Sequence, residues 1–204
     1  MFWSAPLVVN KSTGVKFGKS ESGAVWLDPA KTTPTQFYQF WINVDDDSVE
    51  DFLKIYTLLD EQSIGASMAE QQADPGKRTA QIALAREVTA LVHGIEARDL
   101  AEEVTGYLTG HRPIEQAGDK ALEAMRMEIP AVRSAGTGSI IECLVAGGLA
   151  SSNMDARRLV SGNAVSINGQ KVLRENFEDG DFHNGRILLR KGKAYKDSIL
   201  VELG

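Results

Sequence analysis

From Pro34 onward, the spacing of apolar residues indicates α-helices. Apolar side chains recur every three or four positions, as they do on the buried face of a helix. The four runs are Phe37, Phe40, Trp41 and Val44; Val49, Phe52, Leu53 and Tyr56; Leu84, Val88, Leu91 and Val92; and Ala97, Leu100, Ala101, Val104 and Leu108. Asp47 or Ser48 is expected to cap the second helix. Asp74, Pro75 and Gly94 predict the start and the end of the third.

The two ends of the chain show other patterns. Met1 to Val9 is apolar enough for a buried strand of an α/β sheet, and glycine-bearing loops follow it. Near the other end, Asn168-Gly169 is typical of a type I′ hairpin turn. Two short helices are predicted in the tail at 139–146 and 153–161, and strands at 164–167, 170–173, 186–190 and 199–201.

These patterns predict a multidomain protein. A strand and loop occupy residues 1–33, and a mainly α-helical domain follows at 34–130. Residues 131–136 lack periodicity and are expected to be a linker. A small α+β domain is expected at 137–204.

Composition narrows the class of protein. The 204 residues are 43% hydrophobic and 25% charged, which is typical of globular proteins and excludes collagen-like and wholly disordered chains. The lone Cys143 cannot form an internal disulfide, so a reducing, cytoplasmic location is expected. The net charge of −6 is uneven, because residues 34–132 carry about −10 and both ends are mildly basic.

One loop combines the residues that polyphosphate binding requires. Lys16, Lys19 and Ser20 stand around Gly18 in the run Lys16-Phe17-Gly18-Lys19-Ser20. Ammonium groups neutralise phosphate charge, and glycine allows backbone N–H groups to approach the oxygens. The loop is not a Walker loop, because position 13 is Thr where that motif has glycine. A lysine-rich surface turn is the alternative interpretation.

The sequence around this loop resembles the bacterial-type tyrosyl-tRNA synthetases of class I, whose KMSKS signature often reads Lys-Phe-Gly-Lys-Ser. The resemblance continues through Trp26-Leu27-Asp28-Pro29, Phe37 to Asn43, Phe52 to Leu59 and Ala80 to Gly94. It implies that 1–33 is the edge of a Rossmann-like catalytic domain and that 34–130 is the anticodon-binding domain.

The resemblance also implies the chemistry of the loop. Lys16 and Lys19 would be catalytic, and both would contact the phosphates of ATP together with Ser20. Mg²⁺ would accompany ATP as part of the substrate, and no tightly bound cofactor is implied. The HIGH-type signature and the tyrosine pocket of the family are absent from this sequence. We therefore expect a C-terminal fragment of a tyrosine–tRNA ligase that is inactive alone.

The tail resembles the S-four-type (αL-type) RNA-binding domain found at the end of these synthetases. The matching run extends from Asp155 to Val172. Arg157, Arg158, Lys171 and Arg174 can converge because a helix end and a hairpin lie close together, and such domains bind RNA through phosphates and 2′-hydroxyls. Solvated surface charge is the alternative for these four residues.

The resemblance also implies which molecules the protein binds. The resemblance implies tRNA(Tyr) as partner, with ATP and tyrosine for the full-length enzyme, which would be a homodimer; the fragment is expected to be monomeric.

No metal site is expected, because capping explains Asp45, Asp46 and Asp47. His93 would be a favourable cation near a helix end. A stand-alone RNA-binding protein is the main alternative, and the sister tryptophanyl enzyme a weaker one.

Overall fold

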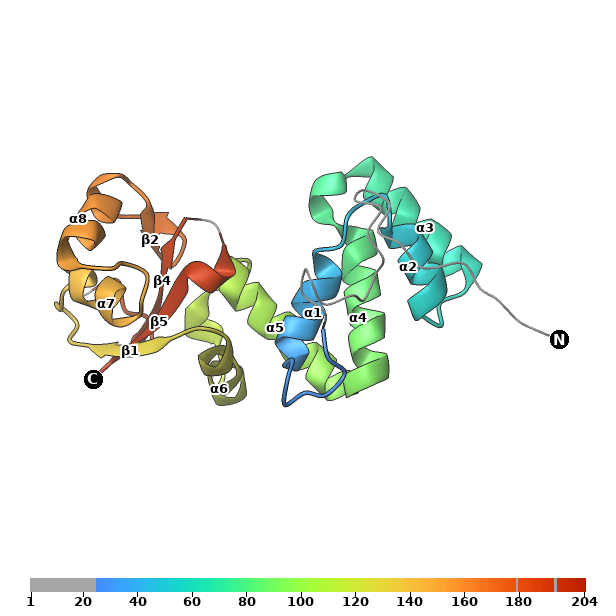
Figure 1. Ribbon diagram of the computed structural model, residues 1–204, viewed down its shortest axis with the longest axis horizontal. Helices are drawn as coiled ribbons and strands as arrows, with labels where there is room; N and C mark the ends of the chain where they lie inside the picture. The colour runs from blue at the N-terminus through green and yellow to red at the C-terminus, as the bar shows by residue number, and fades with distance from the viewer. Residues whose placement is uncertain (1–24, 179, 193) are drawn as a thin grey trace. The chain divides into compact units, whose positions relative to one another are not determined.

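The computed structural model describes residues 25–178, 180–192 and 194–204 (Figure 1). The chain forms two compact units that divide between Glu102 and Glu103, inside helix α5 (Ile95–Thr109). The described residues are rich in helix and carry one small mixed sheet, which confirms the predicted balance of helix and strand. The strand expected over residues 1–9 lies outside the described residues.

The first unit is built from helices around an aromatic core. Its elements are α1 (Pro34–Ile42), α2 (Val49–Tyr56), α3 (Glu61–Ala73), the 3-10 turn η2 (Pro75–Lys77), α4 (Thr79–His93) and the start of α5. Phe37, Trp41, Phe52 and Leu84 are buried together, as the helical spacing predicts. Leu91 and Val92 are exceptions, because their side chains are exposed.

Helix α4 begins later than the sequence predicts. Pro75 starts η2 instead, and Arg78 then takes a left-handed backbone conformation with φ of 52° before α4 begins. The Arg78 side chain explains the interruption. Its Nη2 donates to the carbonyls of Ile42 and Val44, both at 2.9 Å. The two carbonyls belong to the last residue of α1 and to a residue just beyond it, where no following helical turn supplies an N–H partner.

The second unit is a five-stranded sheet with helices packed on it. After the end of α5 come η3 (Ile114–Gln116), α6 (Asp119–Glu128), β1 (Ala131–Ser134), α7 (Ile140–Ala146), α8 (Asn153–Ser161), β2 (Val165–Ile167), β3 (Gln170–Lys171), β4 (Arg186–Lys191), η4 (Tyr195–Asp197) and β5 (Ser198–Leu203). The strand order is β1-β5-β4-β2-β3. Only β1 and β5 run parallel among these pairs.

The tail helices and hairpin lie where the sequence predicts them. Ile140 and Leu144 of α7 share one core with Ala156 of α8 and Ile187 of β4. The Asn168 and Gly169 backbones have φ of 48° and 86°, as a type I′ turn requires. The segment expected as a linker, in contrast, contains β1, because it pairs with β5 and its Val132 packs against the core.

The face of the sheet opposite to the α7 and α8 helices covers the end of α5. Side chains alternate along β4, so Arg186 and Arg190 point away from the face that bears Ile187. Arg190 donates to the carbonyl of Leu108 in the last turn of α5 and to Ser198 Oγ at 3.1 Å. Arg186 Nη1 donates to the carbonyl of Ala117 at 2.9 Å. Burial lowers the pKa of Arg190.

Candidate RNA-binding face

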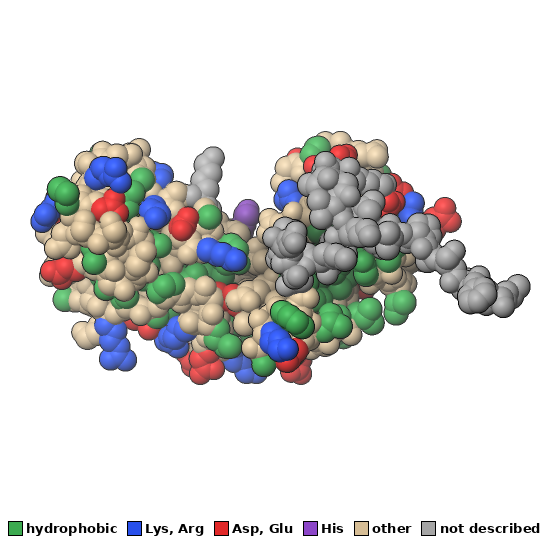
Figure 2. All heavy atoms as spheres, in the orientation of Figure 1, with side chains coloured by type: hydrophobic (Ala, Val, Ile, Leu, Met, Phe, Trp, Pro, Cys, Tyr) green, Lys and Arg blue, Asp and Glu red, His purple; other side chains and the backbone are tan. Residues whose placement is uncertain are grey.

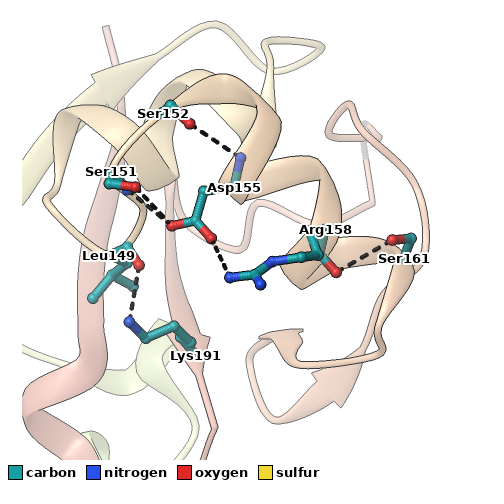
Figure 3. A network of polar contacts seen from close by, with 7 residues as sticks. All are labelled: Leu149, Ser151, Ser152, Asp155, Arg158, Ser161 and Lys191. Carbon is teal, nitrogen blue, oxygen red and sulfur yellow. Dashed lines mark hydrogen bonds and ion pairs between the residues drawn. The ribbon is translucent and has the colours of Figure 1, made fainter.

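Helix α8 carries two of the predicted RNA-binding arginines, and its first turn is fixed by serine caps (Figure 3). Ser152 Oγ accepts the N–H of Asp155 at 3.2 Å, which satisfies one of the unpaired N–H groups of the helix start. The Asp155 carboxylate in turn accepts the N–H of Ser151 at 3.0 Å. The reciprocal bonds hold the α8 N-terminus against the preceding loop.

The same carboxylate holds Arg158. Arg158 Nη2 donates to Asp155 Oδ1 at 2.8 Å, one turn along the helix. The backbone bond from Ser151 and then the Arg158 guanidinium hold the pKa of Asp155 below its ordinary value. The Arg158 side chain is nevertheless 81% exposed. The guanidinium is therefore largely in solvent, where an ion pair contributes little to stability.

Arg157 connects α8 to the segment that follows the hairpin. Its Nε lies 3.2 Å from Glu175 Oε2, and both side chains are more than half exposed. Arg174 precedes Glu175 and is more buried, because it pairs with Asp181 and lies 3.2 Å from Glu178 Oε1. The Arg157–Glu175 pair therefore links α8 to the segment that follows the hairpin.

Lys171 completes the set. It lies on β3 opposite Ser166, its side chain is exposed, and no carboxylate among the described residues pairs with it. Lys171 and Arg174 line the same pocket beside the hairpin. Arg157, Arg158, Lys171 and Arg174 are called the basic face below.

Acidic residues on this face were missed in the sequence analysis. Asp155, Glu175, Glu178 and Asp181 pair with its three arginines. Figure 2 shows basic and acidic side chains intermixed on the visible surface of the second unit, without a continuous basic patch. The spacings Asp155 to Arg158 and Arg174 to Glu178, three and four positions, are signals in the sequence for two of these pairs. The three arginines of the basic face are therefore paired with carboxylates and are not free cations.

The first unit offers RNA little positive charge. Between residues 25 and 102, each Lys and Arg is engaged: Lys31 with the Trp26 ring, Lys54 with Glu50, Lys77 with Asp74, Arg78 with backbone carbonyls, Arg86 with Glu102, and Arg98 with Asp99. Acidic residues outnumber basic ones in the same range. The described part of the first unit therefore has no unpaired cation for phosphate.

Lys16, Lys19 and Ser20 of the expected nucleotide loop lie outside the described residues. Across the ranges that are described, no three His, Cys, Asp or Glu side chains gather as a metal site. None of the described helices is long and apolar enough to cross a membrane.

Comparison with known protein families shows which family the chain belongs to. Residues 2–108, more than half of the sequence, match the family model "tRNA synthetases class I (W and Y)". The chain belongs to this synthetase family. Residues 121–197 match a second model, "Tyrosine--tRNA ligase SYY-like C-terminal domain". The second match assigns the synthetase to the tyrosyl branch and confirms the resemblance drawn from the sequence.

Individual tyrosine–tRNA ligases match most of this chain. The synthetase chain is 42% identical over 200 residues to the tyrosine–tRNA ligase of Anaeromyxobacter dehalogenans, covering 92% of this chain and 46% of that protein. It is 42% identical over 207 residues to tyrosine–tRNA ligase 2 of Bacillus cereus, covering 98% and 47%. A truncated mitochondrial tyrosyl-tRNA synthetase of Coccidioides posadasii matches 49% of this chain and 25% of its own at 36% identity and a TM-score of 0.42. This chain spans about half the length of the curated relatives.

Proposed function

We propose that the chain is the tRNA-binding part of a tyrosine–tRNA ligase, the enzyme that activates tyrosine with ATP and transfers it to tRNA(Tyr). The observation that carries the proposal is the basic face, which lies within the residues that match the ligase C-terminal model. Arg157 and Arg158 project from a capped helix, and Lys171 projects from the adjacent hairpin. Arginine forks suit phosphate oxygens, and both arginine side chains are more than half exposed, so a phosphate can reach them.

The remaining parts take the roles that the family implies. Residues 1–33 contribute Lys16, Lys19 and Ser20 to the binding of ATP phosphates, and the two lysines stabilise charge as tyrosine attacks the α-phosphate. Mg²⁺ arrives with ATP as part of the substrate. Residues 34–130 form the anticodon-binding domain, and residues 137–204, extended by β1, form the S-four-type domain. The complete enzyme is a cytoplasmic homodimer, and this chain alone is a monomer.

A salt titration of tRNA binding tests the basic face. Each neutralised phosphate contributes roughly 0.7–0.9 to the slope of log affinity against log salt. Replacing both Arg157 and Arg158 by Ala should weaken tRNA(Tyr) binding and flatten this slope by roughly 1.5. The fold should hardly change, since exposed pairs contribute little to stability. A thermal melt of each protein checks that point.

A matched control removes the same charge elsewhere on the unit. Lys120→Ala with Arg133→Ala also deletes two exposed cations, neither of which has an ion-pair partner among the described residues. This variant should keep nearly the wild-type slope. Equal slopes for the Arg157/Arg158 variant and wild type would remove the basic face from the proposal. Equal binding of tRNA(Tyr) and unrelated structured RNAs would favour the stand-alone RNA-binding protein instead.

A further inference from the structure

A pocket of about 340 Å³ opens between the β2–β3 hairpin and the segment that leads to β4. This volume lies within the range of small-molecule sites, about 300–1,000 Å³. Its polar lining residues come from both walls: Asn168, Gln170 and Lys171 from the hairpin, and Arg174, Glu178, Asp181 and His183 from the segment.

Hydrogen bonds fix the walls of the pocket without a ligand. Asn168 Nδ2 donates to the carbonyl of Asp181 at 3.2 Å, and its Oδ1 accepts the N–H of Leu188 at 2.9 Å. Asp181 Oδ2 accepts the N–H of Glu178 at 2.8 Å. Asp181 also pairs with Arg174. The hairpin and the segment are thus tied together, and the pocket is preformed.

The charges of the pocket favour an uncharged, hydrogen-bonding group. Among the described lining residues, the cations Lys171 and Arg174 are balanced by the carboxylates of Glu178 and Asp181. A phosphate inside would meet both carboxylates. A nucleobase carries no charge and offers N–H donors that a carboxylate can accept. The Glu178 side chain is 70% exposed, so it can turn toward such donors while Asp181 still holds Arg174.

The pocket adjoins the basic face. Arg174 lines the pocket, and the next residue, Glu175, is bonded to Arg157 of α8. Lys171 belongs to the basic face and also lines the pocket, and no carboxylate among the described residues neutralises it. An RNA backbone that contacts the basic face therefore passes the mouth of the pocket, where an unpaired base can leave the stack and enter.

We propose that this pocket takes the base of one unpaired guanine of a bound RNA. Guanine presents two adjacent donors, N1–H and the 2-amino group, which one carboxylate accepts together; Glu178 fills this role, and Lys171 faces the phosphate of the same nucleotide. The inference rests on the proposed RNA-binding function and adds a base preference to it. Glu178 is then a specificity-determining residue, whereas Arg157 and Arg158 supply affinity that does not depend on sequence.

Four RNA hairpins test the proposal with the full 204-residue chain. They share one stem and differ in a single bulged nucleotide, which is guanine, adenine, uracil or abasic. Fluorescence anisotropy gives the Kd of each. Wild type should bind the guanine hairpin about tenfold more tightly than the abasic one, as expected for the low end of bidentate base recognition. In Glu178→Gln this preference should fall to about twofold or less.

The control variant is Glu123→Gln, which removes an exposed carboxylate on α6, outside the pocket. It should keep the tenfold guanine preference. Equal affinity of wild type for guanine and abasic hairpins overturns the pocket assignment while RNA binding stands, as does a guanine preference that survives in Glu178→Gln. Failure of wild type to bind any hairpin overturns the proposed function itself. Competition by free GMP below the Kd of the hairpin would assign the pocket to a free nucleotide and overturn the RNA assignment.

Discussion

At the scale of single residues, His93 shows how packing changes the charge that a position carries. The sequence places a histidine in the last turn of α4, where a cation is favourable. In the structure its ring meets the Phe37 ring edge-on, with centroids 4.8 Å apart, and its Nε2 is buried without a hydrogen-bond partner among the residues that the structure describes. Burial lowers the pKa of His93 below 6.5, so the neutral form is favoured.

This lowered pKa predicts a loss of stability in mild acid. Because the unfolded chain binds a proton at His93 more readily than the folded chain, the free energy of unfolding should fall as pH drops from about 6.5 toward the folded pKa. His93→Phe should remove this part of the pH dependence. Urea unfolding at pH 7.5 and 5.5 measures it through tryptophan fluorescence, since Trp26 and Trp41 lie in the first unit and residues 103–204 contain no Trp.

The same substitution at the exposed His111 is the control, and it should leave the pH dependence of the first unit unchanged. If wild type and His93→Phe lose equal stability between the two pH values, the His93 ring is protonated in the folded protein without cost.

The sequence could predict that the residues of the basic face come from a helix end and a hairpin, but it could not predict which carboxylates pair with the arginines. A helix end and an Asn-Gly hairpin are local patterns, so they predicted that Arg157 and Lys171 lie near each other. The partner of Arg157 is Glu175, which is 18 positions away in the chain. Such a pairing depends on how α8 packs against the segment after β3, and no local pattern encodes that packing.

At the scale of elements, Arg78 joins α1 to α4. Its guanidinium donates to the carbonyls of Ile42 and Val44 at the end of α1, and the side chain is half-buried. Arg78→Ala should destabilise the first unit by about 2 kcal/mol, as expected for losing hydrogen bonds from a charged donor. Urea unfolding followed by tryptophan fluorescence gives the change.

Arg78→Lys separates charge from geometry in this experiment. Lysine keeps the charge but lacks the planar fork that reaches two carbonyls at once, so it should recover only part of the stability. Full recovery by lysine would mean that charge alone holds the junction. No loss of stability in Arg78→Ala would show that the two carbonyls are satisfied by water.

The elements that the sequence analysis missed have weak patterns for physical reasons. Helix α3 buries only Ile64 and Gln71, so its sequence shows no apolar stripe. Strand β1 has only four residues, and they are partly exposed at the sheet edge. The start of α4 was placed too early because Asp74-Pro75 is a typical helix start, whereas the Arg78 side chain interrupts the backbone there. Helix α6 was not predicted by an apolar run either, whereas periodicity predicted α1, α2 and α5, and local start and turn signals predicted α7 and α8.

At the scale of the whole molecule, the family membership and the half-length coverage of the relatives predict what this chain does alone. We expect no tyrosine-dependent exchange of pyrophosphate into ATP by the purified chain, because the sequence lacks the HIGH-type signature of the family. Binding of tRNA by the same preparation is the positive control. Exchange above the level of a Lys19→Ala preparation would show that the chain holds a complete activation site.

The order of strands in the second unit also affects how the protein behaves in a crowded solution. An edge strand presents unpaired N–H and C=O groups with which another chain can pair. Here the long, apolar strands β4 and β5 are interior, and the edges are β1, with four residues, and β3, with two. The exposed Lys171 on β3 adds a charge to one edge, and Arg133 on β1 adds one to the other. The sheet is thereby protected against edge-to-edge aggregation.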